Sequence, residues 1–325
     1  MFKTLLAAAA ASLVAISAYA QDTAGSEDFR PAVVYDLGGR FDQSFNQAAY
    51  TGAERFMADT GIEYRDFEIQ NDAQRQQALE RFARQGYNPV IAIGFSHAAA
   101  VEAVSQQYPD THFAIVDMVV DQPNVRSILF REQEGSYLVG IMAAMASEND
   151  AIGFVGGMDI PLIRKFECGY FGGARSVNPD IEIYANMTGT DGSAWNNPTR
   201  GAELTRAQID QGADVIYHAA GGTGVGVLQA AADAGVLGIG VDSNQNGLQP
   251  GSVLTSMLKR VDNAVYDTFM DAMNEEFTPG FEVLGLAERG VGFAVDENNA
   301  ELLTPEMMAA VYEAAYDIAT GAIVV

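Results

Sequence analysis

Two successive series of short apolar strands and helices run along this chain, and this alternation constrains the fold more than any other feature. The first series begins with the apolar, β-branched segment 32–35 and ends near Phe130. The second begins with a helix predicted over 134–147, where Leu138, Ile141 and Met145 recur at helical spacing. Strands that alternate with helices form parallel sheets. The sequence therefore predicts an α/β protein with two Rossmann-like lobes.

Each series has its own set of predicted elements. Further strands are expected over 63–67, 89–93, 113–116, 125–130, 152–155, 181–186, 215–218 and 236–241. Helices are expected over 44–59, 72–85, 97–107, 166–176, 201–211 and 224–234. After them come strands over 252–257, 281–286 and 290–295 and helices over 261–277 and 305–320.

The late segments lead back and forth between the lobes. None of the crossings is rich in Pro, Gly or Ser, so several strand-like hinges are expected, which allow closure about a cleft. The predicted boundaries place residues 21–130 and 255–281 in the first lobe, and residues 131–254 and 282–325 in the second. About 300 residues are more than one core usually holds, which agrees with two lobes.

The first twenty residues have the features of a signal peptide. Lys3 is followed by the apolar segment 5–17, and Ala18-Tyr19-Ala20 forms a cleavage site. No later stretch approaches the ~20 apolar residues of a membrane span. The single cysteine, Cys168, is far from the cleavage site and is expected to be a small buried hydrophobic residue. We therefore expect a periplasmic protein without a lipobox cysteine or an internal disulfide.

The net charge excludes one class of partner. The chain has 43 acidic and 18 basic residues and a formal charge of −25. So much negative charge repels phosphate backbones and anionic lipids. Nucleic acid is not an expected partner.

Acidic residues and glycines follow the predicted strands at their carboxyl ends. In open α/β sheets these ends form the crevice where ligands bind. Glycine allows close approach to the backbone, and aspartate offers two acceptors to hydroxyl groups. Each aspartate alone fits equally a helix cap or a turn. The strand ends are occupied by Asp36, Gly94, Asp117, Gly157, Gly221 and Asp242.

The stretch 36–47 combines several of these features. Asp36 ends a strand, and Ser44-x-x-Gln47 reads as a capping box that opens a helix with Phe45 and Asn46 on its first turn. A carboxylate, an aromatic face and an amide thus converge there. The alternative is a capped helix with Phe45 in the core.

Two more side chains are candidates for the same crevice. Trp195, the only tryptophan, lies in the polar loop 191–198 and could form an aromatic clamp with Phe45 around a flat ring. Lys259 follows a strand and is either a donor to a ligand or a solvated lysine. The Gly-rich segment 221–226 lacks the spacing of dinucleotide-binding and P-loop motifs and is interpreted as a turn that presents backbone N–H groups.

Catalytic and metal-binding signatures are missing from the sequence. The three histidines have no metal-type spacing, no G-x-S-x-G occurs, and Cys168 has no placed partner. An enzyme is disfavoured, and no cofactor or metal is expected.

Motifs of a known family occur in six segments: DQSFNQAAYTG (42–52), SYLVGIMAA (136–144), IGFVGGMDIPLIRKFECGYFGGA (152–174), GADVIYHAAGGTGVGV (212–227), IGVDSNQ (239–245) and SVLTSMLKRVDNAVYD (252–267). They resemble the basic membrane protein family, also called PnrA-like, of ABC-transporter substrate-binding proteins. This resemblance implies the type I periplasmic binding fold. It also implies a nucleoside ligand, with a purine base favoured, and an inner-membrane ABC permease as partner of a monomeric receptor.

The resemblance also implies roles for single residues. Phe45 would stack on the base, Asn46 would read its edge, and Asp117 matches an acid that follows a family strand. Trp195 stands where many members have Phe and would form the second face of the clamp. The motifs that hold the ribose contain Gly221, Asp242 and Lys259, and Asp36 is similar to a first-lobe contact.

Two alternatives remain from the sequence. One is the same fold binding a sugar, a flavin or a signalling molecule. The other is a nucleoside-cleaving enzyme, because aspartates clustered near a ribose are also suggestive of glycosidic chemistry.

Overall fold

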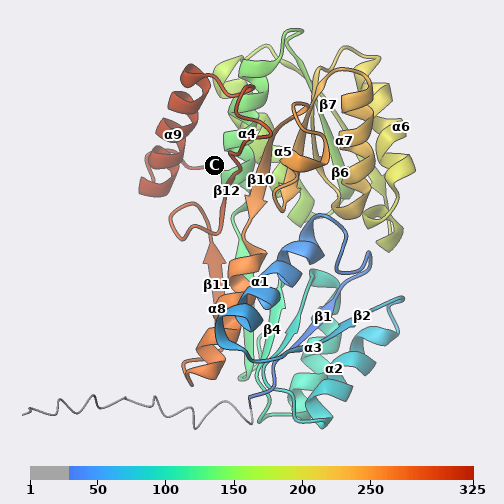
Figure 1. The fold of residues 1–325 in the computed structure, drawn as a ribbon, viewed down its shortest axis with the longest axis vertical. Helices are drawn as coiled ribbons and strands as arrows, with labels where there is room; N and C mark the ends of the chain where they lie inside the picture. The colour runs from blue at the N-terminus through green and yellow to red at the C-terminus, as the bar shows by residue number, and fades with distance from the viewer. Residues whose placement is uncertain (1–28) are drawn as a thin grey trace, which may run out of the picture.

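The computed structural model describes residues 29–325, so the predicted signal peptide 1–20 lies outside the described residues. The chain forms two lobes, and Figure 1 shows the first lobe below the second. Strands of the first lobe are β1 (Ala32–Tyr35), β2 (Arg65–Glu68), β3 (Val90–Ala92), β4 (Phe113–Val116), β5 (Val125–Phe130) and β11 (Gly280–Leu284). Its helices are α1 (Phe45–Thr60), α2 (Gln74–Arg84), α3 (Ala98–Gln107), α8 (Val261–Met273) and the 3₁₀ turn η1 (Phe95–His97).

The second lobe repeats this plan. Its strands are β6 (Ala151–Met158), β7 (Glu182–Gly189), β8 (Val215–Ala219), β9 (Leu237–Asp242), β10 (Val253–Lys259) and β12 (Val291–Phe293). Its helices are α4 (Glu132–Ala146), α5 (Pro161–Val177), α6 (Pro198–Ile209), α7 (Gly224–Asp233) and α9 (Pro305–Thr320). Three 3₁₀ turns accompany them, η2 (Gly192–Trp195), η3 (Gly221–Thr223) and η4 (Asn246–Leu248).

The two sheets have the same strand order. The first sheet runs β11-β5-β4-β3-β1-β2 and the second β12-β10-β9-β8-β6-β7. All pairings are parallel except that of β12, which is antiparallel to β10. This confirms the α/β class with two parallel-dominated sheets that the alternation of strands and helices predicts.

Strand β1 shows why helices cover both faces of the first sheet. Side chains alternate along a strand, so Val33 and Tyr35 point to one face and Val34 to the other. Val33 and Tyr35 belong to the cluster that includes residues of α1 and α8, whose Phe56 and Phe269 rings lie 5.2 Å apart. Val34 packs instead with residues of α2 and α3. Both faces of this strand are therefore buried, as its continuous apolar run predicts.

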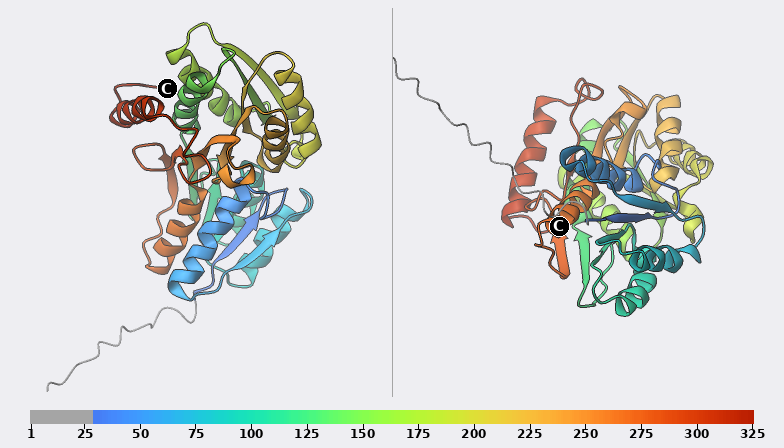
Figure 2. Two further views of the ribbon diagram at one scale, coloured as in Figure 1. Left: turned by 45° about the horizontal axis from the view of Figure 1, so that its top comes forward. Right: turned by 60° about the horizontal axis from the view of Figure 1, so that its bottom comes forward.

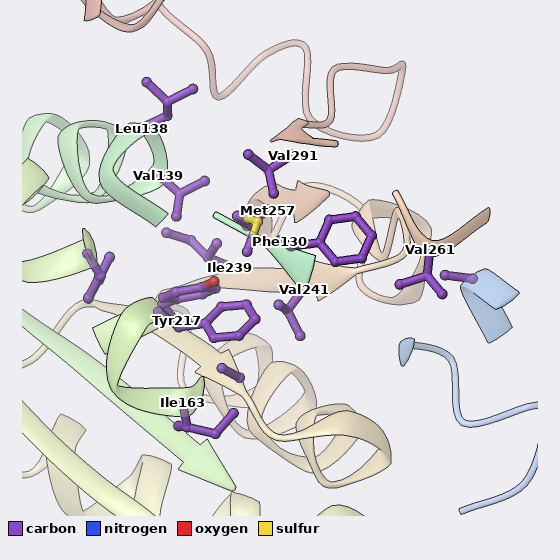
Figure 3. Close-up of a cluster of buried hydrophobic side chains, with 14 of the residues drawn as sticks. Phe130, Leu138, Val139, Ile163, Tyr217, Ile239, Val241, Met257, Val261 and Val291 are labelled. Carbon is purple, nitrogen blue, oxygen red and sulfur yellow. The ribbon is translucent and has the colours of Figure 1, made fainter. Parts of the chain in front are cut away.

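One hydrophobic cluster continues from the first lobe into the second. Figure 3 shows its central part, where Phe130 of β5 lies near Met257 of β10 and Val261 of α8. Tyr217 and Val241 extend the cluster into the second sheet. The crossings next to Phe130 and Val261 are thus packed against apolar side chains, whereas the third crossing has exposed residues at 287–289.

The lobe boundaries differ from those predicted in two places. β10 pairs with β9 and β12, so residues 255–259 belong to the second sheet and not to the first lobe. β11 pairs with β5, so residues 282–284 belong to the first sheet. An apolar run predicts a strand but not its partner. The second and third crossings between the lobes therefore come after Lys259 and after Leu284, later than predicted. Figure 2 shows the two lobes from two further sides.

Cys168 also differs from its expected environment. It lies on α5, with its neighbours Glu167 and Gly169 buried, and is itself exposed. The prediction of a buried cysteine is wrong, because the family-like segment around it is a helix whose outer face includes this position.

Candidate functional site

A cavity lies between the carboxyl ends of the two sheets. Residues of both lobes line it, as expected for a ligand site at the ends of parallel strands. The eight residues for which the sequence predicts a binding role all line it: Asp36, Phe45, Asn46, Asp117, Trp195, Gly221, Asp242 and Lys259. Of the two other strand-end glycines, Gly94 lines the cavity and Gly157 does not. The cavity also includes side chains that sequence reasoning did not select, namely Leu37, Asp42, Phe95, Leu162, Ile163 and Phe166. Helical spacing in the segment after Pro161 could have indicated the last three, but such spacing equally suggests core.

Asp117 and Lys259 form a buried ion pair across the lobes. Lys259 Nζ lies 2.6 Å from Asp117 Oδ1 and 2.7 Å from its Oδ2, and the side chains are 2% and 4% exposed. Glu132 Oε1 lies 3.1 Å from the same ammonium. Burial disfavours the ammonium, but the carboxylates of Asp117, Glu132 and Asp242 outweigh it and raise the pKa of Lys259. The interpretation of Lys259 as a solvated lysine is therefore wrong.

The ammonium of Lys259 is also surrounded by aromatic rings. It lies 5.1 Å from the ring centres of Phe45 and Phe130 and 5.6 Å from that of Phe166. At these distances a cation is attracted to the faces of aromatic rings. Phe45 is therefore held against Lys259 while it lines the cavity.

Asp242 is bound differently. Its Oδ2 accepts a hydrogen bond of 2.6 Å from Ser44 Oγ of the other lobe, and no cation pairs with it among the described residues. Burial raises the pKa of Asp242 to about 7, opposed by Lys259 and by the Ser44 hydroxyl. Asp242 lines the cavity and can exchange a proton near neutral pH.

Asp36 and Asn46 are engaged with their own lobe. Arg75 Nη1 lies 2.7 Å from Asp36 Oδ1, and Leu37 N donates to the same oxygen at 2.7 Å. Burial raises the pKa of Asp36, and Arg75 opposes this shift. Asn46 Oδ1 accepts a hydrogen bond from Asp36 N at 3.1 Å. The amide of Asn46 therefore fixes the end of β1 as well as lining the cavity.

The expected capping box at the start of α1 is not formed. Asp42 instead accepts hydrogen bonds from the backbone N–H groups of Ser44, Asn46 and Gln47 at 2.8–3.0 Å. The Ser44 side chain makes no capping bond and reaches across to Asp242. Asp42 does the capping because its two oxygens accept three donors at once, which frees the Ser44 hydroxyl for the other lobe.

Trp195 is fixed at the end of η2. Thr188 Oγ1 and Thr223 Oγ1 both donate to the carbonyl of Ala194, at 3.0 and 2.7 Å. The indole lies so close to Gly157 that a Cβ at that position would overlap it. Phe95 of the first lobe meets the indole edge to face, with ring centres 6.4 Å apart. The structure therefore places Phe45 and Trp195 at one cavity and adds Phe95, which the sequence analysis missed.

Further hydrogen bonds join the lobes beside the cavity. Ser243 Oγ donates to the carbonyl of Ser44 at 2.7 Å, and Gln245 Nε2 donates to the carbonyl of Gln43 at 2.9 Å. Gln43 adopts a left-handed backbone with φ of +62°. The two lobes are thus in contact on the side of the cavity where α1 begins.

No group of three or more His, Cys, Asp or Glu residues within 29–325 is arranged to hold a metal ion. The carboxylates of the cavity are instead bound to Arg75, Lys259, Ser44 and backbone N–H groups.

A family model described as "ABC transporter substrate-binding protein PnrA-like" matches residues 29–315. Among curated proteins, the "ABC transporter nucleoside-binding protein BmpA" of Lactococcus lactis is 32% identical, with 100% of this chain and 99% of that protein covered. A protein of Pyrococcus furiosus named as a lipoprotein is 36% identical over 82% of this chain and 70% of its own length. Among solved structures, an ABC transporter solute-binding protein of Aeropyrum pernix has a TM-score of 0.84 at 30% identity, covering 91% of this chain and 92% of that one.

The lipoprotein name of the Pyrococcus relative disagrees with the expectation of a protein without a lipid anchor. The only cysteine of the present sequence is Cys168. Within residues 29–325, none of the helices is both long and apolar enough to cross a bilayer.

Proposed function

The chain belongs to the Bmp family of PnrA-like ABC transporter substrate-binding proteins, and from this premise we propose that it binds a nucleoside, with a purine base, in the cavity between its lobes. It would act in the periplasm as a monomer and deliver the nucleoside to an inner-membrane permease. The observation that carries the proposal is a cavity that combines aromatic faces from both lobes with the strand-end carboxyl group of Asp242, which has no ion-pair partner within residues 29–325.

The aromatic side chains support a flat ring as one part of the ligand. Phe45 comes from the first lobe and Trp195 from the second, and both line the cavity. Stacking of a base on an aromatic side chain is worth ~1–3 kcal/mol in nucleic-acid sites. The purine would lie between these two rings, with Asn46 and Asp117 toward its polar edge.

The carboxylates support hydroxyl groups as the other part. Asp242 accepts one hydrogen bond, from Ser44, and keeps further acceptor capacity toward the cavity. A ribose offers neighbouring hydroxyls, which are donors that a carboxylate binds well. Asp242, Lys259 and Asp36, with the backbone at Gly221, would hold the sugar.

The charges favour a ligand without a phosphate. Lys259 and Arg75 are each already paired with carboxylates. A phosphate dianion would therefore meet Asp36, Asp117 and Asp242 without an uncompensated cation. Nucleosides should bind and nucleotides should bind poorly.

Isothermal titration calorimetry with adenosine, guanosine and inosine tests the proposal directly. Binding of at least one of them is expected, with the corresponding 5′-monophosphate much weaker. Equal affinity for AMP and adenosine would contradict the assignment of a neutral ligand. A thermal-shift comparison with arabinose, ribose and riboflavin separates nucleosides from other ligands, because a ligand at 100-fold over its Kd stabilises by ~2.7 kcal/mol.

We also propose that the protein binds its ligand without cleaving it. The cavity carboxylates are bound to cations, to a hydroxyl or to helix N–H groups, which supports a role in binding rather than in glycosidic cleavage. Incubation with inosine should release no free hypoxanthine on chromatography.

A further inference from the structure

We propose that Glu132, which does not line the cavity, determines the selectivity of this site against anionic ligands. Its carboxylate compensates the charge of Lys259 from the side of the lysine that faces away from the cavity. The inference rests on the proposed nucleoside function. It names the residue that makes the site bind nucleotides more weakly than nucleosides. No motif in the sequence singled out Glu132.

The position of Glu132 follows from the hinge. It is the first residue of α4, directly after the crossing at Arg131, and it is fully buried. Its Oε1 lies 3.1 Å from Lys259 Nζ, and its Oε2 lies 3.2 Å from Lys165 Nζ. Lys165 also donates to the carbonyl of Phe130 at 3.2 Å. Glu132 thus bridges two lysines at the point where the chain passes between the lobes.

The four groups balance their charges. Asp117 and Glu132 are the two carboxylates, and Lys259 and Lys165 are the two ammonium groups. Without Glu132, Asp117 and the two lysines would carry one net positive charge, next to the cavity that Lys259 lines. Buried charges interact strongly because little water screens them. Glu132 therefore removes the attraction that a buried lysine would otherwise exert on an anion.

The aromatic cage around Lys259 makes this counter-charge necessary. Phe45, Phe130 and Phe166 surround the ammonium and exclude water from it. Of these rings, Phe45 and Phe166 also line the cavity. Without Glu132, Lys259 would keep Asp117 as a counter-ion, and an anionic group on the ligand could replace the second negative charge that Glu132 supplies.

The experiment compares variants by their relative affinity for a nucleoside and its anionic forms. Adenosine, adenosine 5′-carboxylate and AMP, or the guanosine series if guanosine binds better, are titrated by calorimetry at low salt. Glu132→Gln should raise the affinity for AMP relative to adenosine by at least about tenfold. The carboxylate, with one negative charge, should show a smaller gain in the same direction.

Lys165→Gln provides a test of opposite sign. Lys165 is 39% exposed, so its loss leaves the fold intact more readily than the loss of buried Glu132. Its removal leaves the cluster one unit more negative, and the relative affinity for the 5′-carboxylate should fall. In the double variant Glu132→Gln/Lys165→Gln, the affinity for the anionic ligand relative to adenosine should be close to that of the wild type. If Glu132→Gln fails to fold, Lys165→Gln decides the question.

Glu134→Gln is the matched control. Glu134 lies in the same first turn of α4 and loses the same charge, but it accepts from Leu286 N at 2.7 Å and faces Arg131 instead of the lysines. It does not line the cavity, and its substitution should leave the ratio unchanged.

The outcomes separate this inference from the proposed function. A wild type that binds none of the nucleosides contradicts the proposed function. Binding of the nucleoside with an unchanged ratio in Glu132→Gln, or the same change in Glu134→Gln, overturns the role of Glu132.

Discussion

Asp117 and Asp242 occupy equivalent positions in the two lobes but differ in how their charge is compensated. Asp117 follows β4 and Asp242 ends β9, which hold the same place in the two strand orders. Both adopt a left-handed backbone, with φ of +72° and +64°. Each is bound by a side chain from the opposite sheet or lobe, Asp117 by the ammonium of Lys259 and Asp242 by the hydroxyl of Ser44. One is a fixed ion pair, and the other is a carboxyl group whose proton is labile.

The difference arises at another pair of equivalent strand ends. Lys259 ends β10, and its counterpart at the end of β5 is Phe130. The repeated topology therefore fixes where the aspartates lie, and single residues on neighbouring strands fix their charge. A shared fold gives a shared site geometry without shared electrostatics.

Removal of Lys259 should change the stability of the protein more than any other substitution at these two strand ends. Lys259→Met leaves Asp117 and Glu132 buried without their common cation. The free energy of unfolding should fall by about 3–5 kcal/mol, measured by urea denaturation without ligand. A loss below about 1 kcal/mol would show that the ion pair does not distinguish the two strand ends.

Asp242 should make a distinct contribution to the dependence of stability on pH. Burial raises its pKa from 3.8 to about 7, so between these values the folded protein keeps a proton that the unfolded chain has released. Its contribution to stability is therefore full below about pH 4 and is lost as the pH rises through about 7. The unfolding free energy of the wild type minus that of Asp242→Asn should fall by up to about 4 kcal/mol over this range. A difference that stays constant with pH would contradict the labile proton.

The aromatic walls of the two lobes should contribute similarly to binding. Trp195→Ala and Phe45→Ala should each lower nucleoside affinity by ~1–3 kcal/mol if both rings stack on the base. Phe45→Ala should in addition lower stability, because its ring also faces Lys259. Phe41→Ala is the control, since this ring is 61% exposed and should leave calorimetric affinity unchanged. Unchanged affinity of Trp195→Ala would return that residue to a structural role.

The smallest effects should separate the two residues at the start of α1. Asp42→Ala removes the acceptor of three helix N–H groups and should lower the unfolding free energy by about 1–2 kcal/mol. Ser44→Ala removes one hydroxyl and should cost about 1 kcal/mol, while raising the pKa of Asp242 further. Loss of the pH effect in Ser44→Ala, measured by the same denaturation series, would contradict this division of roles.

Much of the fold could be predicted from local patterns. The strands 32–35, 113–116 and 125–130 and the helix 305–320 agree with the structure to the residue, because apolar runs bounded by turn residues report burial directly. The parallel sheets follow from the alternation of strands and helices. The two misplaced boundaries at 255 and 282 concern strands whose partners lie far away in sequence, which no local pattern encodes.

The candidate site was predicted in part for the same reason. Strand ends in parallel sheets must meet at one edge, so Asp36, Asp117 and Asp242 could be grouped without a structure. Phe95 and Glu132 could not be assigned to the site from the sequence, because neither belongs to a pattern that distinguishes it from an ordinary turn or helix residue. The binding roles of the eight predicted residues remain predictions that the variants above test.

The amino-acid sequence by itself determined the class of fold, the family and the group of residues at the strand ends, because periodicity, motif strings and the ends of parallel strands are local properties. Only the tertiary structure decided which partner each charged group has. Ser44 turns from its own helix toward Asp242, 198 positions away, and Lys259 is buried between Asp117 and Glu132. These pairings depend on distance in space and on the exclusion of water. Neither can be inferred from local patterns along the chain.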